Sequence, residues 1–243
     1  MIAMREKRPE RVPELLAPAG DIEAGYAAFQ CGADAIYVGL ARFSARADAI
    51  NCSPEDLGAL VAHAHALVPR RRVYVAINTL VLDHELDAAA ETLAQVALAQ
   101  ADAVIVQDLG VARLAQRFFP TLALHASTQM AVHSLEGARI LHRLGFKRVT
   151  LARELTLAEI RRIAEMSGIE VEVFAHGALC YSYSGLCLYS SHMRGRSGNR
   201  GRCAYPCRDR FTVADEAWHP VGQSRFSFSM KDMAMTDHIG DLR

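Results

Sequence analysis

The segment Gly32-Ala33-Asp34-Ala35-Ile36-Tyr37-Val38 passes from a turn into an apolar run, and Ala101-Asp102-Ala103-Val104-Ile105-Val106 repeats the pattern further along the chain. Each copy follows a helical pattern and opens a short strand. Nearly continuous apolar strands are typical of a parallel sheet that is covered on both faces. A recurring helix–strand unit favours a barrel over an irregular sheet. This repetition therefore predicts an α/β fold built from one repeated unit.

The same alternation extends outward from these two segments in both directions. The predicted strands are Glu14–Ala17, Ala35–Gly39, Val73–Thr79, Ala103–Gln107, Leu122–Ala126, Arg148–Ala152 and Glu170–Phe174. The helices between them are predicted to begin near Asp21, Ser53, His84, Leu109, Ser134 and Thr156. Ser53-Pro54-Glu55-Asp56 places a cap, a proline and two acids at a helix start. The alternation, with right-handed crossovers, predicts a TIM-like (β/α) barrel.

The predicted strands number seven, one fewer than a closed βα barrel contains. Beyond residue 208 we find a polar stretch, a short apolar run at Phe226–Met230 and a possible helix at Lys231–Leu242. We therefore expect a barrel truncated before its eighth strand, with a Cys-rich metal-binding loop after strand 7. The expected parts are a polar N-terminal extension (1–13), a barrel core (14–180), and a cluster-binding segment with an incomplete barrel end (181–243).

Composition sets limits on the class of protein. The 243 residues are 51% hydrophobic, carry no net charge and have a pI near 7.1, so global charge offers no argument for nucleic acid. Residues 1–12 lack the apolar core of a secretion signal, and no apolar run reaches the roughly 18 residues of a membrane span. These features predict a cytoplasmic enzyme with no membrane partner.

Four cysteines lie close together near the end of the chain, at Cys180, Cys187, Cys203 and Cys207, with gaps of six, fifteen and three residues. In a chain without a secretory signal, such a group indicates a metal site rather than disulfides. The spacing favours a [4Fe–4S] cluster, with zinc as the second reading and metal-free thiols as the third. Cys31, on an apparent helix face, is expected in the core.

Polar residues follow every predicted strand, at the end where a βα barrel carries its site. Each of these residues taken alone could simply cap the next helix. Taken together, they bring Arg, Asn, Gln, Glu and His side chains to the same open end of the barrel, which we call its mouth. Glu154, His176 and Arg153 are the candidate catalytic residues, the first two for proton transfer. Arg46, Asn78 and Gln129 are the candidate substrate-binding residues. Arg46 or Arg153 suits a small carboxylate through bidentate pairing.

The cysteine-rich stretch is also locally basic and aromatic. Six arginines lie at positions 194, 196, 200, 202, 208 and 210, and tyrosines 181, 183, 189 and 205 are interleaved with the cysteines. Phosphate pairing and base stacking make such a loop a candidate RNA-contact surface. The alternative is a solvated arginine loop, or arginines that neutralise an anionic cluster.

Several motifs together resemble peptidase family U32. They are Glu14–Gly20 (ELLAPAG), Gly32–Gly39, His125–Gln129 (HASTQ), Leu151–Leu155 (LAREL), Glu172–Cys180 (EVFAHGALC) and Ser184-Gly185-x-Cys187, and the resemblance covers about residues 14 to 235. The family was named for collagenase-like proteolysis. Its better-understood members are oxygen-independent hydroxylases of a 23S rRNA cytidine, a tRNA wobble uridine, or the ring of a ubiquinone precursor.

The resemblance implies a four-cysteine iron–sulfur cluster and prephenate as the oxygen source. By motif position, Cys180, Cys187 and Cys203 match cluster ligands, and Cys207 matches the fourth. The stretch Arg196–Gly201 most resembles the ribosomal RNA branch. We therefore expect a hydroxylase that modifies a pyrimidine in rRNA or tRNA, with RNA and a small carboxylate as partners.

Alternatives remain at this point. One alternative is a collagenase-like peptidase, but the sequence contains no His-Glu-x-x-His or Gly-x-Ser-x-Gly motif. A Cys/His protease needs one activated thiol, whereas Cys180, near His176, has three neighbouring thiols. A ubiquinone-biosynthesis hydroxylase subunit, or a non-catalytic barrel that binds RNA or a partner subunit, also fits the pattern.

Overall fold

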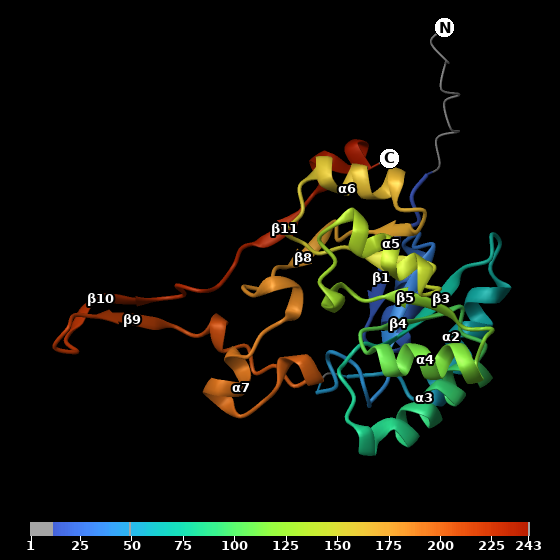
Figure 1. Cartoon of the computed structure of the whole chain (residues 1–243), viewed down its shortest axis with the longest axis horizontal. Coiled ribbons are helices and arrows are strands. Elements are labelled where there is room, and N and C mark those ends of the chain that lie inside the picture. The colour runs from blue at the N-terminus through green and yellow to red at the C-terminus, as the bar shows by residue number, and fades with distance from the viewer. Residues whose placement is uncertain (1–11, 49, 243) are drawn as a thin grey trace, which may run out of the picture.

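The computed structural model describes residues 12–48 and 50–242, and its centre is one parallel sheet (Figure 1). Most of the expected extension 1–13 lies outside these residues. The strands are β1 (Leu16–Ala19), β2 (Ala35–Gly39), β3 (Arg72–Ile77), β4 (Ala103–Val106), β5 (Ala123–Ala126), β6 (Arg148–Thr150) and β7 (Glu170–Glu172). Each strand pairs in parallel with the next in chain order, so the sheet curls progressively into a half-barrel.

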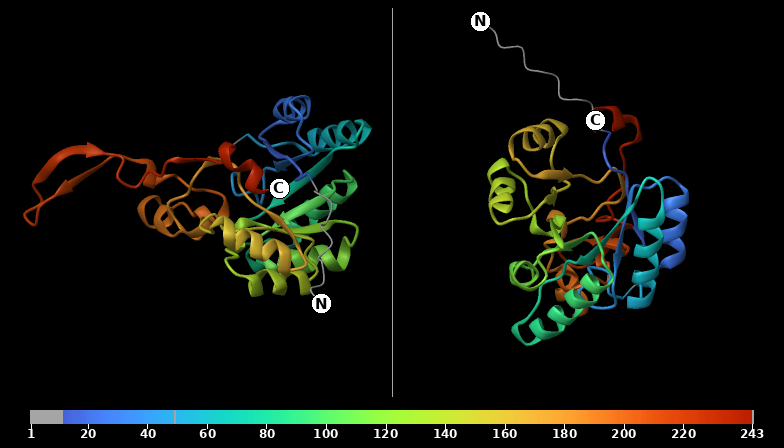
Figure 2. Two further views of the ribbon diagram at one scale, coloured as in Figure 1. Left: turned by 90° about the horizontal axis from the view of Figure 1, so that it is seen from above. Right: turned by 90° about the vertical axis from the view of Figure 1, so that its right-hand side faces the viewer.

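One helix follows each of the first six strands and covers the outer face of the sheet (Figure 2). These helices are α1 (Ile22–Gln30), α2 (Pro54–Ala66), α3 (Leu86–Leu98), α4 (Leu109–Phe118), α5 (Leu135–Arg143) and α6 (Leu157–Met166). The expected starts are confirmed where a side chain caps the helix: Asp21, Ser53, Ser134 and Thr156 each accept a first-turn N–H. His84 lies in a 3₁₀ turn, Asp83–Glu85, just before α3.

The two faces of the sheet differ in chemistry. Along β3, the alternate residues Val73, Val75 and Ile77 are fully buried in the main core, on the face that the helices cover. The inner face has only a small apolar cluster, built around Tyr74 and Ile105. Each aliphatic side chain buried on the outer face stabilises the fold by about 1.5–3 kcal/mol. The inner face is left for polar groups.

The parallel sheet ends at β7 within the described residues, and β1 and β7 are not paired. The following strand, β8 (His176–Ala178), pairs antiparallel with β11 (Asp232–Ala234) as a separate ladder. The helix expected over Lys231–Leu242 is wrong for its first part, which forms β11, and the remainder is the 3₁₀ helix Thr236–Leu242. The alternation Met233-x-Met235 explains the strand, since both methionines line a small apolar cavity beside Phe174.

Several strand bounds differ from the sequence-based expectation by two residues. The first strand begins at Leu16 rather than Glu14, because the Glu14 carboxylate binds side chains at the starts of β3 and β6. The third strand ends at Ile77, since Asn78 turns away to accept a hydrogen bond from the loop after β2. The sixth and seventh strands likewise end at Thr150 and Glu172.

A long β-hairpin projects from the body of the molecule and was not expected from the sequence (Figures 1 and 2). It consists of β9 (Phe211–Ala214) and β10 (Pro220–Arg225), and Trp218 near its tip is 87% exposed. A short helix, α7 (Tyr189–Arg194), lies between the hairpin and the sheet (Figure 1). None of the helices in the described ranges is long and apolar enough to cross a bilayer.

Candidate functional site

An ion network fills the amino-terminal end of the inner face. Arg148 on β6 donates to Glu14 (2.7 Å) and to Glu170 (2.9 Å), and Tyr74 donates its hydroxyl to Glu14 (2.8 Å). Burial raises the pKa of Glu14, but the hydrogen bond and positive charge of Arg148 outweigh this and lower the pKa overall. Because each buried charge has a partner here, this network closes one end of the half-barrel rather than offering a site.

Next to this network, the inner face holds four buried polar atoms without a hydrogen-bond partner in the described residues, although one of them, Glu172 Oε2, lies 3.6 Å from the Arg148 guanidinium. They are Gln107 Oε1, His125 Nδ1, Gln129 Oε1 and Glu172 Oε2, and we call these four residues the interior polar cluster. Burial, with the charges of Arg148 and Arg72, lowers the pKa of His125 to about 3, so its ring is neutral near pH 7. Burial also raises the pKa of Glu172.

Two expected substrate-binding residues lie at the rim above this cluster. Arg46 is exposed in the loop after β2, and its charge opposes the rise in the pKa of Tyr37 that burial causes. Arg46 therefore lies close enough to the inner face to act on it. Asn78 is engaged differently: its Oδ1 accepts the Ala45 N–H at 2.8 Å and so shapes the loop that carries Arg46.

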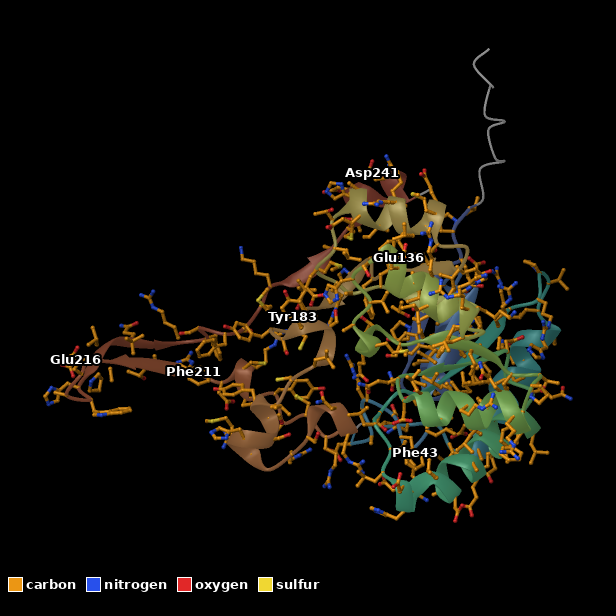
Figure 3. All side chains as sticks on the ribbon, in the orientation of Figure 1. Phe43, Glu136, Tyr183, Phe211, Glu216 and Asp241 are labelled. Atoms are coloured by element: carbon orange, nitrogen blue, oxygen red, sulfur yellow. The ribbon has the colours of Figure 1, made fainter. Side chains whose placement is uncertain are left out.

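Glu154, after β6, holds the cysteine segment, which we define as residues 180–208. Its carboxylate accepts the Ser184 N–H (2.8 Å) and hydroxyl (2.7 Å), and His133 Nε2 lies at 3.1 Å. Burial raises the pKa of Glu154, but the Ser184 hydrogen bonds outweigh it and lower the pKa overall. Ser184 is completely buried and its Oγ accepts the Arg153 N–H at 3.2 Å. This arrangement anchors the 3₁₀ turn Tyr183–Gly185 (Figure 3).

His133, in the loop between β5 and α5, supports this anchor from the other side of Glu154. Its Nδ1 lies 2.7 Å from the Ala131 carbonyl oxygen, which only accepts, and its Nε2 faces the carboxylate of Glu154. Glu154 acts on the cysteine segment as a charged tether.

A second anchor holds the cysteine segment from the other side of the mouth. Arg200 pairs with Glu85 at 2.6 Å, and Arg196 pairs with Asp48 in the loop after β2. The hydrogen bond from Arg200 holds the pKa of Glu85 at about 2. Gly201 packs so closely that a Cβ there would lie 2.1 Å from the Ser44 carbonyl oxygen. Only glycine fits, because φ is also +77° at this position.

Asn199 connects this second anchor to a cysteine. Its carbonyl oxygen accepts the Leu80 N–H at 3.2 Å, beside β3, and its Oδ1 accepts the Cys187 N–H at 3.3 Å. The position of Cys187 is therefore set relative to the sheet by one amide side chain.

All four cysteines of the segment are reduced, and the structure brings three of them near one another. Burial raises the pKa of the Cys207 thiol, and the proximity of Cys180 and Cys203 raises it further. The Sγ atoms of Cys187 and Cys203 accept main-chain N–H groups two residues on, at 3.3 and 3.4 Å. Over the described residues, however, no three His, Cys, Asp or Glu side chains stand in a metal-holding arrangement.

The donor set nonetheless fits a soft metal site in its composition. Four thiols without disulfide partners, on one segment with flexible glycines, are the ligands that zinc and iron–sulfur clusters take. Cys31, in contrast, is exposed at the end of α1, so its expected place in the core is wrong. The helix ends one residue before it, which turns the thiol away from the packed face.

The arginines that suggested an RNA surface bind the protein itself. Besides Arg196 and Arg200, Arg194 pairs with Asp209 (2.8 Å), Arg208 donates to the Leu179 carbonyl (3.0 Å), and Arg210 lies over the Phe226 ring. These contacts dock the cysteine segment and the base of the hairpin. Tyrosines 181, 183 and 205 are exposed, although the Tyr181 ring packs against Phe228 and the Tyr183 ring against His133.

His176 and Arg153 complete the expected set. His176 is exposed on β8 and pairs in register with Ala234 of β11. Within the described residues, its side chain forms no hydrogen bond or ion pair with Glu154. The Arg153 guanidinium lies over the Phe174 ring, 5.7 Å from its centroid. Arg153 is thus presented on an aromatic surface at the end of β7.

The residues that sequence reasoning missed share a signal. Tyr37 and His125 are single polar positions within otherwise apolar strands, and Glu172 alternates with Val171 in β7, a pattern that marks the inner face. Ser184 and Asn199 give no such signal, because their roles depend on contacts with distant loops.

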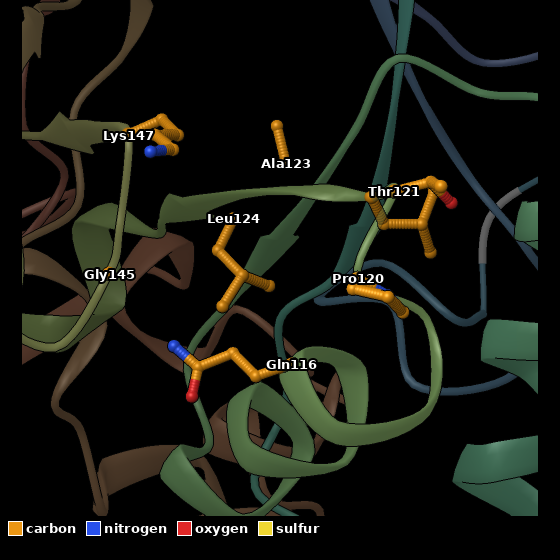
Figure 4. Close-up of a pocket in the computed structure, with 8 residues that line it drawn as sticks. Gln116, Pro120, Thr121, Ala123, Leu124, Gly145 and Lys147 are labelled. Atoms are coloured by element: carbon orange, nitrogen blue, oxygen red, sulfur yellow. The ribbon is translucent and has the colours of Figure 1, made fainter.

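A cavity also lies away from these residues. A hollow of about 270 Å³ at the amino-terminal ends of β5 and β6 is bounded by Gln116, Thr121, Leu124 and Lys147 (Figure 4). The Gln116 amide nitrogen already donates to the Leu144 carbonyl there. We assign no function to this hollow.

Comparisons with known proteins agree on one family. Residues 20–243 match Peptidase family U32. The chain is 40% identical to the 23S rRNA 5-hydroxycytidine C2501 synthase of Escherichia coli K12, over 94% of this chain and 34% of that protein. It is 34% identical to tRNA hydroxylation protein P of Helicobacter pylori 26695, over 94% of this chain and 56% of that protein.

Other relatives carry a different name, and one solved structure shares the fold. The Collagenase of Porphyromonas gingivalis W83 is 32% identical, over 84% of this chain and 51% of that protein. The U32 peptidase Mk0906 has a TM-score of 0.58 and 16% identity, over 72% of this chain and 73% of that one. The chain spans between about a third and just over half the length of these curated relatives.

Proposed function

The chain belongs to peptidase family U32, and from this we propose that it is an RNA-modifying hydroxylase acting on a pyrimidine base without molecular oxygen. The observation that carries the proposal is the similarity to the Escherichia coli synthase, which extends over 94% of this chain. That span takes in the sheet, its mouth and the cysteine segment. Relatives named for tRNA hydroxylation support the same reaction class on another RNA.

The cofactor in this proposal is a [4Fe–4S] cluster held by Cys180, Cys187, Cys203 and Cys207. Its support is the set of four free thiols, two of which already accept main-chain N–H groups as cluster sulfurs do. When bound, the cluster would supply a Lewis acid or a redox relay at the mouth. Zinc is the alternative occupant of the same thiols. In this proposal residues 14–180 form the barrel core, and residues 181–243, together with Cys180, bind the cluster.

The co-substrate in this proposal is a small carboxylate, with prephenate as the oxygen donor. Arg46 and Arg153 would bind it, because both guanidinium groups lie at the rim and neither forms an ion pair in the described structure. His176 would move protons at the mouth. The contacts of Glu154 favour positioning of the cysteine segment over direct proton transfer, and those of Asn78 favour shaping of the Arg46 loop.

The proposal places the enzyme in the cytoplasm, where its RNA is found and thiols stay reduced. A partner subunit is compatible with the exposed hairpin. Proteolysis is the second candidate, because one relative is named a collagenase. The presence of four thiols on one short segment argues against it, since a cysteine protease uses one activated thiol beside a histidine.

Nucleoside analysis tests the function directly. Ribosomal and transfer RNA from cells with and without the gene would be digested and compared by mass spectrometry. We expect a hydroxylated pyrimidine to disappear on deletion and to return with the wild-type gene and with Cys31→Ser, but not with Cys187→Ser. An unchanged nucleoside profile after deletion would overturn the hydroxylase proposal.

A further inference from the structure

The base of the projecting hairpin is held together by side chains from both of its ends. Figure 3 shows Phe211 where the hairpin joins the body of the molecule, and its ring meets Phe228 edge-on, with 4.8 Å between the ring centroids. The Arg208 guanidinium donates to the Ser229 hydroxyl (2.9 Å) and to the Met230 carbonyl (3.0 Å). It thereby ties the chain that enters β9 to the chain that leaves β10. We call these residues the hairpin base: Arg208, Phe211, Phe228 and Ser229.

The hairpin base also holds both neighbours of Cys180. The Arg208 guanidinium donates to the Leu179 carbonyl at 3.0 Å, directly before this cysteine. Directly after it, the Tyr181 ring meets Phe228, with 5.4 Å between the centroids and 75° between the planes. The strand that leads to Cys180, β8, pairs with β11, which follows the hairpin. Cys180 therefore takes its position from the hairpin base and β11, although it opens the cysteine segment.

The other end of the cysteine segment is attached to the same base. Cys207 immediately precedes Arg208, so the guanidinium that binds the Leu179 carbonyl belongs to the next residue in the chain. Cys180 lies close enough to Cys207 to raise the pKa of its thiol. Cys187 is held differently, because its N–H donates to an amide oxygen within the segment. Arg208 thus joins the first and the last of the four cysteines.

The placement of the separate thiols decides how readily a metal site forms. Among the residues that the structure describes, no three ligand side chains stand in a metal-holding arrangement, so metal binding has to draw the thiols together. Ordering the chain in that step costs conformational entropy. A ligand that is already held near its final place lowers this cost. Two cysteines attached to one base give the site such a start.

We propose that Arg208 is a positioning residue for the metal site, which holds Cys180 near Cys207 so that both ends of the cysteine segment meet as ligands of one soft metal centre. The inference rests on the four-cysteine site of the proposed function and adds the residue that assembles it. Arg208 acts by geometry, because its planar guanidinium donates in fixed directions to acceptors on three sides. An ammonium group on a flexible stem lacks this fork.

Three substitutions separate geometry from charge and from a general effect of losing an arginine. Arg208→Gln removes the guanidinium that binds the Leu179 carbonyl and the chain after β10. Arg208→Lys keeps the positive charge but loses the planar fork. Arg225→Gln makes the same change as the first variant on β10, a strand that is exposed throughout, and serves as the control.

The measurement is a titration of the purified, reduced and metal-free full chain with Co²⁺, whose thiolate complexes absorb visible light. We expect the wild-type protein and Arg225→Gln to bind Co²⁺ equally well. We expect Arg208→Gln to bind it about tenfold more weakly, the equivalent of one or two net hydrogen bonds, and Arg208→Lys to stay weak. Equal affinity of Arg208→Gln and the wild type, or full rescue in Arg208→Lys, would overturn the inference.

A cycle of double substitutions identifies the cysteine through which Arg208 acts. Adding Arg208→Gln to Cys180→Ser should change the Co²⁺ affinity by less than about twofold, because the ligand that Arg208 positions is already absent. Adding it to Cys187→Ser should still weaken binding by about tenfold. An equal loss in both backgrounds would mean that Arg208 supports the fold in general, which contradicts a role through Cys180.

The two proposals fail in different ways. If gene deletion leaves the nucleoside profile unchanged, the hydroxylase proposal fails, whereas a loss of Co²⁺ affinity that depends on Cys180 still supports the role of Arg208. If hydroxylation depends on the gene but the cycle shows no dependence on Cys180, the role of Arg208 is overturned and the hydroxylase remains. A wild-type chain whose thiols take up no Co²⁺ would overturn both the metal site and the role of Arg208.

Discussion

Leu60 and Leu93 are completely buried where α2 and α3 cover the sheet, whereas Leu186 and Leu188 of the cysteine segment are 50% and 74% exposed. The sheet and its helices gain their stability from apolar burial. The cysteine segment instead depends on the Glu154–Ser184 contacts, on Arg200–Glu85 and on the close approach of Gly201 to Ser44. The comparison indicates that the sheet and its helices share an apolar core, and that a few polar contacts hold the cysteine segment on them.

Leu→Ala substitutions, one in each region, should give the largest difference in the free energy of unfolding. Leu60→Ala removes a fully buried side chain and should lower the free energy of unfolding by about 2–5 kcal/mol. Leu188→Ala should change it by less than about 0.5 kcal/mol, since its side chain is mostly in water. Urea denaturation followed by circular dichroism measures both. Similar losses for the two variants would mean that the segment is part of the same core.

The second anchor should depend on Gly201 in a way that Gly195 does not share. Both glycines have positive φ, but an added Cβ meets the Ser44 carbonyl at position 201 and nothing within 4 Å at position 195. Gly201→Ala should therefore weaken docking of the segment by about 3 kcal/mol, and Gly195→Ala by the backbone strain alone. Hydrogen exchange of residues 196–208 measures the docking. Equal exchange in the two variants would remove close packing as the reason for the anchor.

Acid should act on the sheet through His125. Its folded pKa of about 3 lies below the unfolded value of about 6.5, so the unfolded chain takes up the proton first and stability falls as pH drops between these values. Between pH 7.5 and pH 5 this amounts to a loss of about 2 kcal/mol. Urea unfolding at the two pH values, compared with His125→Gln, isolates the contribution. An equally large loss in the variant would assign it to other groups.

The Arg200–Glu85 pair should have the smallest effect. Both side chains are partly in water, so Glu85→Gln should weaken docking by less than about 1 kcal/mol, and less still at high salt. Hydrogen exchange of residues 196–208 at low and high salt measures it, with the exposed Glu91→Gln as the control. A loss as large as that of Gly201→Ala would make charge, rather than packing, the basis of this anchor.

The sheet was predictable because its signals are local. Apolar runs such as Ala35–Gly39 mark the buried strands, and caps such as Ser53 and Thr156 mark the helix starts. The hairpin was missed because its strands, apart from Phe211, are exposed and show no burial period. The helix expected near Lys231 was wrong because pairing with β8 decides that segment, and this contact is distant in sequence.

The site was predictable only in part, for a similar reason. Strand ends suggested Arg46, Arg153 and Gln129, and the structure places Arg46 near Tyr37 and Arg153 over Phe174, while their binding roles stay predictions. The cysteine spacing suggested a metal site, and the structure brings Cys207 near Cys180 and Cys203. Chemical type alone suggested proton transfer for Glu154, whereas its hydrogen bonds to Ser184 show a tether. Gln107 was noted as a strand end, but the burial that leaves it unpaired appears only in the folded chain.

The most direct test of the account is the metal content of the protein purified without oxygen. Iron, acid-labile sulfide and zinc would be measured with the visible spectrum for the wild-type chain, Cys187→Ser and the control Cys31→Ser. The account predicts about four iron and four sulfide per chain in the wild type and in Cys31→Ser, and loss of both in Cys187→Ser. Stoichiometric zinc, or no metal on intact thiols, would contradict it.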